Sequence, residues 1–483
     1  MGSKVLDVNE KLGCFLDKLI FENNDVCIFD ILNKSDKLYK YKYGDGSFLV
    51  DKVLKYYVDS LLCESFERAQ FYSCIIFEIL KRDNYRFSKV DSIIFQLRGL
   101  KSKLNGGKKY KYVMSFIDRL SILNGSLSKK DLKGFERDFD ISVNFSSSIE
   151  SIDDVSFSRK CNLVDRRDRQ IITMDHKFKV SYDDAISIEK TDYGYLFGIY
   201  ISDVTSFVGV DSLLYEHARQ RGESIYGDLN NSFYIPMFPR EITKNLFSLN
   251  KGEDKCVVAY MFKFSDSFDL IDSYFENAII NVSNNYSFDY IDKFSKDDSN
   301  YDMIYLLMKL TDSLNFCFNG DYHRFKEKNK KVGYDNGVGS NIISRATIFL
   351  NTYIAELFMK YNWPYIYRVN YNIFDGLESD SDIKKFVKGS SFSRYSICAS
   401  AHPVNNGRVY GHITNPIRSF ASYVNQYLFS CLCLDSCDNG SFIDYWNMVL
   451  PDLVSELNFR LSKNKEFLSV LSELDRKSLT KRK

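Results

Sequence analysis

Three aspartates flank a pair of apolar segments in the middle of the chain. Asp175 ends the segment 171–175, and Asp183 and Asp184 open the next apolar segment. Carboxylates packed between hydrophobic strands cost free energy unless a cation pairs with them. Mg²⁺ prefers oxygen ligands, often binds substrate phosphate, and can activate water at a phosphodiester. The spacing is therefore compatible with a magnesium-dependent hydrolytic site, while ordinary surface acids remain the alternative for this short pattern.

The strands and helices that position these acids can be predicted from the periodicity of apolar residues. Apolar residues at 195–201 and 256–262 predict two further strands. Helical periodicity predicts a mainly helical region over 1–150, a long core helix around 342–357, and another helix at 441–475. The polar, Ser- and Asp-rich residues 135–160 predict a linker.

A basic stretch lies within the N-terminal helical region. Its cations are Arg98, Lys101, Lys103, Lys108, Lys109 and Lys111, interrupted by Gly106-Gly107 and interleaved with Tyr110 and Tyr112. One interpretation is a solvated helix–loop–helix. The other is an RNA-backbone patch, since lysines bind phosphates and tyrosines stack on bases.

The overall composition limits the classes of function. The chain has 483 residues, 16% aromatic residues and a formal net charge of +1. A protein that coats nucleic acid would be far more basic, so RNA binding would need local patches or a shielded channel. The first twenty residues match neither a signal nor a transit peptide, and no uninterrupted apolar window is long enough for a membrane helix.

The cysteines give little support to a zinc site. The eleven cysteines follow no regular framework, which indicates reduced thiols and a cytoplasmic, intracellular location, with an organelle not excluded. Cys431, Cys433 and Cys437 cluster, but their spacing is unusual for zinc. Buried thiols are the expected alternative.

Several different motifs follow one another between about residues 160 and 430. They are Thr173-x-Asp175, Asp183–Ile188, Gly198–Val204, Asp211–Leu214, Ala218–Tyr226, Ile235–Pro239, Asn245–Asn250, Phe349–Asn351, Pro364–Val369 and Gly411–Arg418. Together they closely resemble the catalytic domain of the ribonuclease II/R (RNB) exoribonuclease family.

The resemblance implies a fold and an activity. The expected fold class is α/β, with a mixed sheet ringed by helices over 160–435, a helical and possibly winged-helix-like N-terminal domain over 1–150, and a helical C-terminal extension over 436–483. The implied activity is metal-dependent, hydrolytic 3′→5′ degradation of single-stranded RNA to nucleoside 5′-monophosphates, with Mg²⁺, or alternatively Mn²⁺, as the cofactor.

The resemblance also assigns roles to individual residues. Asp175 and Asp184 would bind the metal, and Asp183 would orient water or complete the metal site. Arg418 would clamp phosphate and stabilise developing charge. The expected RNA-binding residues are Tyr226, which would stack on the terminal base, Arg368, and His412, for which a structural role is the alternative.

The chain also departs from the family pattern. Ser181 stands where the family has a fourth aspartate, and this loss should weaken metal binding. Ser419, Ser422 and Gln426 replace an arginine, an aspartate and a histidine, and Arg345 replaces an acid. These changes fit either a divergent active nuclease or a catalytically impaired protein that binds RNA 3′ ends or scaffolds a complex. Altered chemistry, such as endonuclease or DNA cleavage, is a third alternative.

The flanking regions show no pattern typical of the family's cold-shock and S1 domains. Those OB-fold barrels guide single strands. Their lack would weaken substrate capture or transfer it to a protein partner.

Overall fold

The computed structural model describes most of the chain from residue 47 onwards. The described residues are 47–64, 69, 72–73, 76, 80, 87–104, 107–123, 163–177, 179–226, 234–294, 300–314, 337–372, 391–405, 407–435 and 439–480. The predicted linker over 135–160 lies outside these residues.

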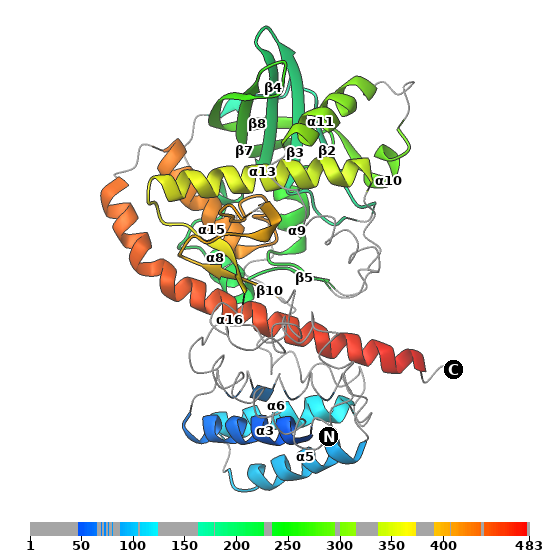
Figure 1. The fold of residues 1–483 in the computed structure, drawn as a ribbon, viewed down its shortest axis with the longest axis vertical. Helices are drawn as coiled ribbons and strands as arrows, with labels where there is room; N and C mark the ends of the chain where they lie inside the picture. The colour runs from blue at the N-terminus through cyan, green and yellow to red at the C-terminus, as the bar shows by residue number, and fades with distance from the viewer. Residues whose placement is uncertain are drawn as a thin grey trace, which may run out of the picture.

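A mixed sheet forms the centre of the molecule (Figure 1). Its strands are β1 (Val164–Asp165), β2 (Ile171–Asp175), β3 (Asp184–Thr191), β4 (Gly194–Ser202), β7 (Asp254–Phe264) and β8 (Leu270–Ser287). Their order is β1-β8-β2-β3-β4-β7. The long strand β8 pairs antiparallel with β7 along its first part and parallel with β2 along its last, so the sheet closes on itself.

The closed sheet has two apolar faces, which explains why all nine residues of β4 are buried. Leu196 and Tyr200 join one cluster of buried residues, while Phe197 and Ile199 join the larger cluster on the opposite face. Alternation along the strand therefore separates two hydrophobic cores. The sequence of a strand that is buried on both faces is a continuous run of apolar residues.

Helices cover the sheet and extend around it (Figure 1). They are α8 (Leu213–Arg221), α9 (Arg240–Ile242), α10 (Phe288–Ile291), α11 (Tyr301–Ser313), α13 (Val338–Lys360), α15 (Phe420–Phe429) and α16 (Asn439–Thr480). Shorter helical turns are η3 (Val204–Ser206), η4 (Thr243–Phe247), η5 (Pro403–Asn405) and η6 (Ser430–Leu434). Two small hairpins complete this part: β5 (Ile225–Tyr226) with β6 (Tyr234–Ile235), and β9 (Tyr367–Asn372) with β10 (Ser391–Ser396).

The apolar stripe predicted at 342–357 lies in α13. Ile342, Ala346, Leu350 and Ile354 are fully buried, which confirms the stripe as core. By length and composition α13 could also cross a membrane, but half of its most apolar window is buried against the rest of the protein, as in an ordinary core helix.

The described parts of the N- and C-terminal regions are helical, as predicted. Helices α3 (Ser47–Leu62), α5 (Phe87–Lys101) and α6 (Gly107–Leu123) form a separate layer around Leu54, Ile93 and Phe116. The long helix α16 runs between this layer and the part that contains the sheet, and it contacts α6, α8, β5 and β10 (Figure 1). The mixed α/β fold with helical flanks is confirmed.

Candidate active site

Strand pairing places the three aspartates at one end of the sheet. Asp175 is the last residue of β2, Asp184 is the first of β3, and the two strands pair antiparallel. Asp183 lies just before β3, where its carbonyl accepts a 2.9 Å hydrogen bond from the Ser202 backbone N–H. The sequence therefore delivers all three carboxylates from strand ends whose positions the ladder fixes.

All three carboxylates are buried and incompletely paired. Asp175, Asp183 and Asp184 are 8%, 0% and 4% exposed, and the Oδ2 atom of each lacks a hydrogen-bond partner among the described residues. Burial raises the pKa of Asp175 to about 7, and the charge of Asp184 adds to the rise. Burial also raises the pKa of Asp183. Such a cluster favours the approach of a cation or a proton.

Lys179 is a cation inside the cluster that the sequence analysis missed. Its Nζ lies 2.6 Å from Asp175 Oδ1, and the two side chains are only 14% and 11% exposed. The lysine charge opposes the rise in pKa of both Asp175 and Asp183. The signal was visible as a lysine four residues after Asp175, but the sequence alone did not show which way the loop folds.

Arg418 is a second cation of the cluster and contacts Asp183. Its Nε lies 3.2 Å from Asp183 Oδ2, and the Ile417 N–H donates a 3.1 Å hydrogen bond to Asp183 Oδ1. Asn415 Oδ1 accepts a hydrogen bond of 3.1 Å from the same Nε. Asp183 thus joins residues far apart in the sequence and fixes the turn that carries Arg418.

Tyr226 lies near this arginine and stacks on a second tyrosine. Its ring centroid is 5.0 Å from that of Tyr234, with an angle of 28° between the ring planes. Burial raises the pKa of Tyr226, and the charges of Arg418 and Asp183 also act on it. The backbone N–H of Ser224 donates to the Arg418 carbonyl at 2.9 Å, which ties the tyrosine hairpin to the arginine turn. Tyr234 was not predicted, because the pairing of β5 with β6 cannot be read from local sequence.

Arg368 and His412 form a neighbouring group. The Arg368 guanidinium lies over the Tyr395 ring at 4.6 Å. Desolvation, with the charges of Arg368, His402 and Arg418, lowers the pKa of His412 to about 3, so its ring is neutral. Both predicted RNA-binding residues are therefore close to the arginine side of the site, and none of the described hydrogen bonds or ion pairs joins them to the aspartates.

The positions that differ from the family occupy different environments. Ser181 is 3% exposed in the loop before Asp183, and Ser422 is fully buried with its hydroxyl unpaired among the described residues. Ser419 Oγ lies 3.5 Å from the Tyr395 hydroxyl. Arg345 forms an ion pair with Asp312 of α11, which directs its charge toward that helix.

The aspartates provide oxygen ligands, but they do not form a closed metal cage. Within the described ranges, no three His, Cys, Asp or Glu side chains are arranged closely enough to hold a metal. Mg²⁺ often uses only one or two carboxylates together with water and substrate phosphate. The unpaired oxygens of Asp175 and Asp184 fit such an open site, provided that Lys179 releases Asp175.

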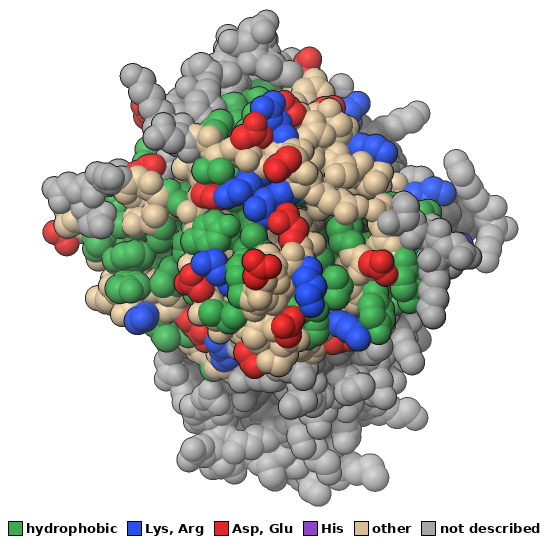
Figure 2. All heavy atoms as spheres, turned by 90° about the horizontal axis from the view of Figure 1, so that it is seen from above, with side chains coloured by type: hydrophobic (Ala, Val, Ile, Leu, Met, Phe, Trp, Pro, Cys, Tyr) green, Lys and Arg blue, Asp and Glu red, His purple; other side chains and the backbone are tan. Residues whose placement is uncertain are grey.

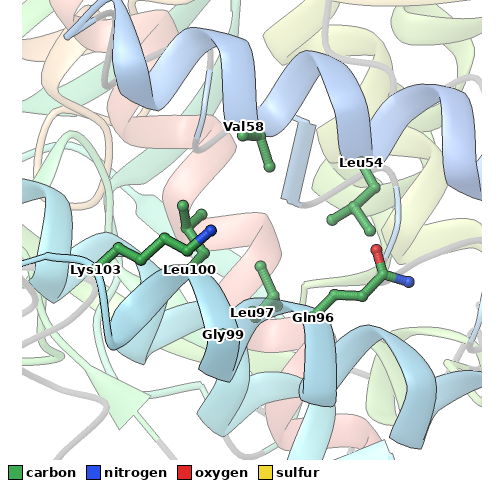
Figure 3. A pocket seen from close by; sticks show the side chains of 7 residues that line it. All are labelled: Leu54, Val58, Gln96, Leu97, Gly99, Leu100 and Lys103. Carbon is green, nitrogen blue, oxygen red and sulfur yellow. The ribbon is translucent and has the colours of Figure 1, made fainter.

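Other features of the described residues lie away from the carboxylates. A cavity of about 300 Å³ between α3 and α5 is lined mainly by apolar side chains, with Gln96 and Lys103 as its polar members (Figure 3). It belongs to the N-terminal helical layer, far from β2 and β3 (Figure 1). Its lining brings together no titratable pair, so we interpret it as a packing gap.

The basic stretch adopts the predicted helix–loop–helix, formed by α5 and α6. Lys109 pairs with Glu64 at 3.2 Å, and Lys101 lies 5.3 Å over the Tyr110 ring. Gly106 and the side chains of Lys108 and Lys111 lie outside the described residues, so the RNA-backbone patch stays a prediction. Of the three clustered cysteines, Cys431 is buried and Cys433 is half-buried, and Cys437 also lies outside the described residues.

Known proteins share this fold and parts of this sequence. The RNB domain family matches residues 163–402. Ribonuclease R of Thermotoga maritima is 27% identical over 237 residues, which is 44% of this chain and 33% of that protein. The structure of Mycoplasma genitalium RNase R with ribose-methylated single-stranded RNA has a TM-score of 0.58 at 16% identity, covering 71% of this chain and 63% of that one. Yeast Ssd1, described as a pseudonuclease, has a TM-score of 0.51 at 13% identity, over 71% of this chain and 49% of its own.

The chain spans less than two thirds of the length of each of these proteins. The family match begins just before β1, so it includes all three aspartates. The ordered motifs, the closed sheet and these matches together show that the chain is a divergent RNB-domain protein of the ribonuclease II/R family.

Proposed function

We propose that the chain is a metal-dependent, hydrolytic exoribonuclease that trims single-stranded RNA from its 3′ end and releases nucleoside 5′-monophosphates. The observation that carries the proposal is the group of three buried aspartates at one end of the sheet. Asp175 and Asp184 each have an oxygen without a hydrogen-bond partner among the described residues, and Asp183 pairs with Arg418. Buried carboxylates that are only partly paired are costly to a fold, and their presence at one point favours a functional role. The matches to ribonuclease R sequences support the same activity.

The protein's own side chains would bind and orient the RNA end. Arg418 would hold the scissile phosphate and stabilise negative charge that develops on it. Asp183 would act as a positioning residue, because its carboxylate is fully buried and contacts the Ile417 N–H and the Arg418 guanidinium. The Tyr226 ring would provide a stacking platform for the terminal base.

Asp175 and Asp184 are the residues that would hold Mg²⁺. When bound there, the ion would neutralise charge on the phosphodiester and activate the attacking water. Among the described residues, two carboxylates of the cluster are available for this role, because Asp183 is turned toward Arg418 and Ser181 supplies no charge. We therefore expect metal binding to depend on the additional oxygens of the RNA phosphate.

A second candidate function is RNA 3′-end binding without hydrolysis. Two observations favour it: Ser181 in place of an acid, and the ion pair between Lys179 and Asp175, which neutralises a proposed metal ligand. The structural likeness to Ssd1 shows that this fold occurs in a pseudonuclease. A protein partner could then supply RNA capture or cleavage.

A comparison of linear and circular RNA tests the proposal. The purified chain is incubated with Mg²⁺ and a uniformly labelled single-stranded RNA, either linear or circularised, and the products are separated by thin-layer chromatography. We expect nucleoside 5′-monophosphates from the linear RNA and no product from the circle. Oligonucleotides from the circle would indicate an endonuclease. Two intact RNAs, with binding retained, would indicate the second candidate function.

A further inference from the structure

Lys179 is part of the carboxylate cluster. Its ammonium is 2.6 Å from Asp175 Oδ1, and its charge also acts on Asp183. A lysine that is only 14% exposed loses much of its hydration, so its position depends on the acids around it. The ion pair between Lys179 and Asp175 is therefore largely shielded from solvent, unlike an ion pair on the surface.

The charges of the cluster are nearly balanced by the protein itself. Among the described residues, Asp175, Asp183 and Asp184, if ionised, face Lys179 and Arg418, which leaves one net negative charge. An acid at position 181 would add another, but the chain has Ser181 there. A divalent ion that joined the cluster while Lys179 remained would make the group net positive and would lie close to a like charge.

We propose that Lys179 is a resident cation of this cluster, which occupies the place beside Asp175 that a divalent metal would take, so that lysine and metal compete for the same carboxylate. The inference rests on the proposed function only in assuming that the cluster can accept a divalent ion. It predicts weak metal binding in the absence of RNA, because the metal must displace an ammonium that is already paired. The long, flexible lysine side chain allows this displacement without a change in the backbone.

Metal binding without RNA tests the inference directly. Binding of Mn²⁺ is followed by electron paramagnetic resonance for the wild-type chain, for Lys179→Met and for Lys177→Met. Lys177 is an exposed lysine of the same loop and serves as the matched control. We expect Lys179→Met to bind Mn²⁺ at least about tenfold more tightly than the wild type, because a like charge a few ångströms from the ion is removed. Lys177→Met should bind like the wild type.

Further variants separate charge from shape. Lys179→Arg keeps the charge and should retain the weak binding of the wild type. The double variant Asp175→Asn/Lys179→Met should lose the gain, because the lysine acts through Asp175. If Lys179→Met does not fold, as judged by circular dichroism, Lys179→Gln replaces it in the same series.

Equal Mn²⁺ affinity in the wild type and the neutral variant would overturn the inference, as would an equal gain in Lys179→Arg. RNA hydrolysis is measured separately. Tighter Mn²⁺ binding by Lys179→Met without any hydrolysis, in that variant or the wild type, would contradict the proposed function and still support the inference.

Discussion

Asp183 connects the two halves of the candidate site through one fully buried carboxylate. One oxygen accepts the Ile417 N–H at 3.1 Å, and the other faces Arg418 at 3.2 Å. The carboxylate thus fixes the direction of the guanidinium that would meet the RNA phosphate. Changes here should affect the rate of hydrolysis more than the capture of RNA.

The variant Asp183→Asn tests this role. The amide keeps an oxygen for the Ile417 N–H but removes the charge that faces Arg418. We expect hydrolysis to fall by roughly 100-fold or more, as for the loss of one preorganised electrostatic contact, with RNA affinity nearly unchanged. Initial rates and filter-binding affinities on the same RNA measure the two effects. An equal loss of both would indicate a folding role for Asp183.

Tyr226→Ala tests the stacking platform. Loss of one base–ring stack should weaken binding of the RNA end by about 1–3 kcal/mol and leave a longer final product, because short RNA ends are no longer held. The control is Tyr361→Ala, which removes a tyrosine that is 52% exposed and stacks on Trp363. An unchanged end product on a denaturing gel would exclude the clamp.

The neutral ring of His412 predicts a pH dependence of stability. Its pKa is lowered to about 3 in the folded chain, compared with an ordinary value of 6.5. On acidification, the His412 side chain therefore takes up a proton at a higher pH in the unfolded chain than in the folded chain. The contribution of the neutral ring to stability is complete above pH 6.5 and is lost as the pH falls toward 3, by at most ~1.4 kcal/mol per pH unit.

Urea unfolding at pH 7.5 and 5.5 measures this contribution. The wild type should lose more stability on acidification than His412→Gln, which cannot take up the proton. The same loss in both proteins would show that other groups, such as His402 or His217, cause the pH dependence.

Helix α16 contacts strands β5 and β10 from outside the family match. The amide of Asn458 bonds both the N–H and the carbonyl of Tyr395, each at 2.9 Å. Asn464 donates to the Arg221 carbonyl at 3.0 Å, and Leu457 lies where a side chain at Gly222 would be. Gly222 adopts a φ of 71°, which turns the chain from α8 toward Tyr226. This helix therefore positions both the Tyr395 ring beneath Arg368 and the loop before Tyr226.

Asn458→Ala should destabilise the fold by about 1–3 kcal/mol, because two backbone groups of Tyr395 lose their partners. Asp452→Ala, at an exposed position of the same helix, is the control and should change stability little. Urea denaturation provides both values. Equal stability of the two variants would show that α16 does not hold the β10 strand through Asn458.

The elements that follow local patterns could be predicted from the sequence, and so could the acids at their ends. Strands β2, β3, β4 and β7 and helices α13 and α16 were predicted because their apolar periods are local. The sequence did not reveal Lys179, Tyr234 and Asn458. Their partners are set by the direction of a loop, by the pairing of β5 with β6, and by the contact of α16 with the distant strand β10. Tertiary contacts of this kind leave no periodic signal in one sequence.

The whole molecule combines an RNB domain with helical layers and a nearly neutral charge. The net charge is +1, and on the described part of the face in Figure 2 acidic and basic side chains are interspersed. With a net charge of +1, general electrostatic attraction would contribute little to RNA binding. The partly exposed group of Arg418, Lys179 and Tyr226 would suit the binding of a single strand end, and we propose that a partner protein assists the capture.

The most direct test of the central claim is the fate of a 5′-labelled single-stranded RNA incubated with the purified chain in Mg²⁺, in Mn²⁺ and in EDTA, and separated on a denaturing gel. The account predicts a ladder that shortens from the 3′ end to a small labelled product with either metal, and intact RNA in EDTA. Intact RNA in every lane, with a gel shift that shows binding, would contradict hydrolysis and favour a protein that holds RNA ends without cutting them.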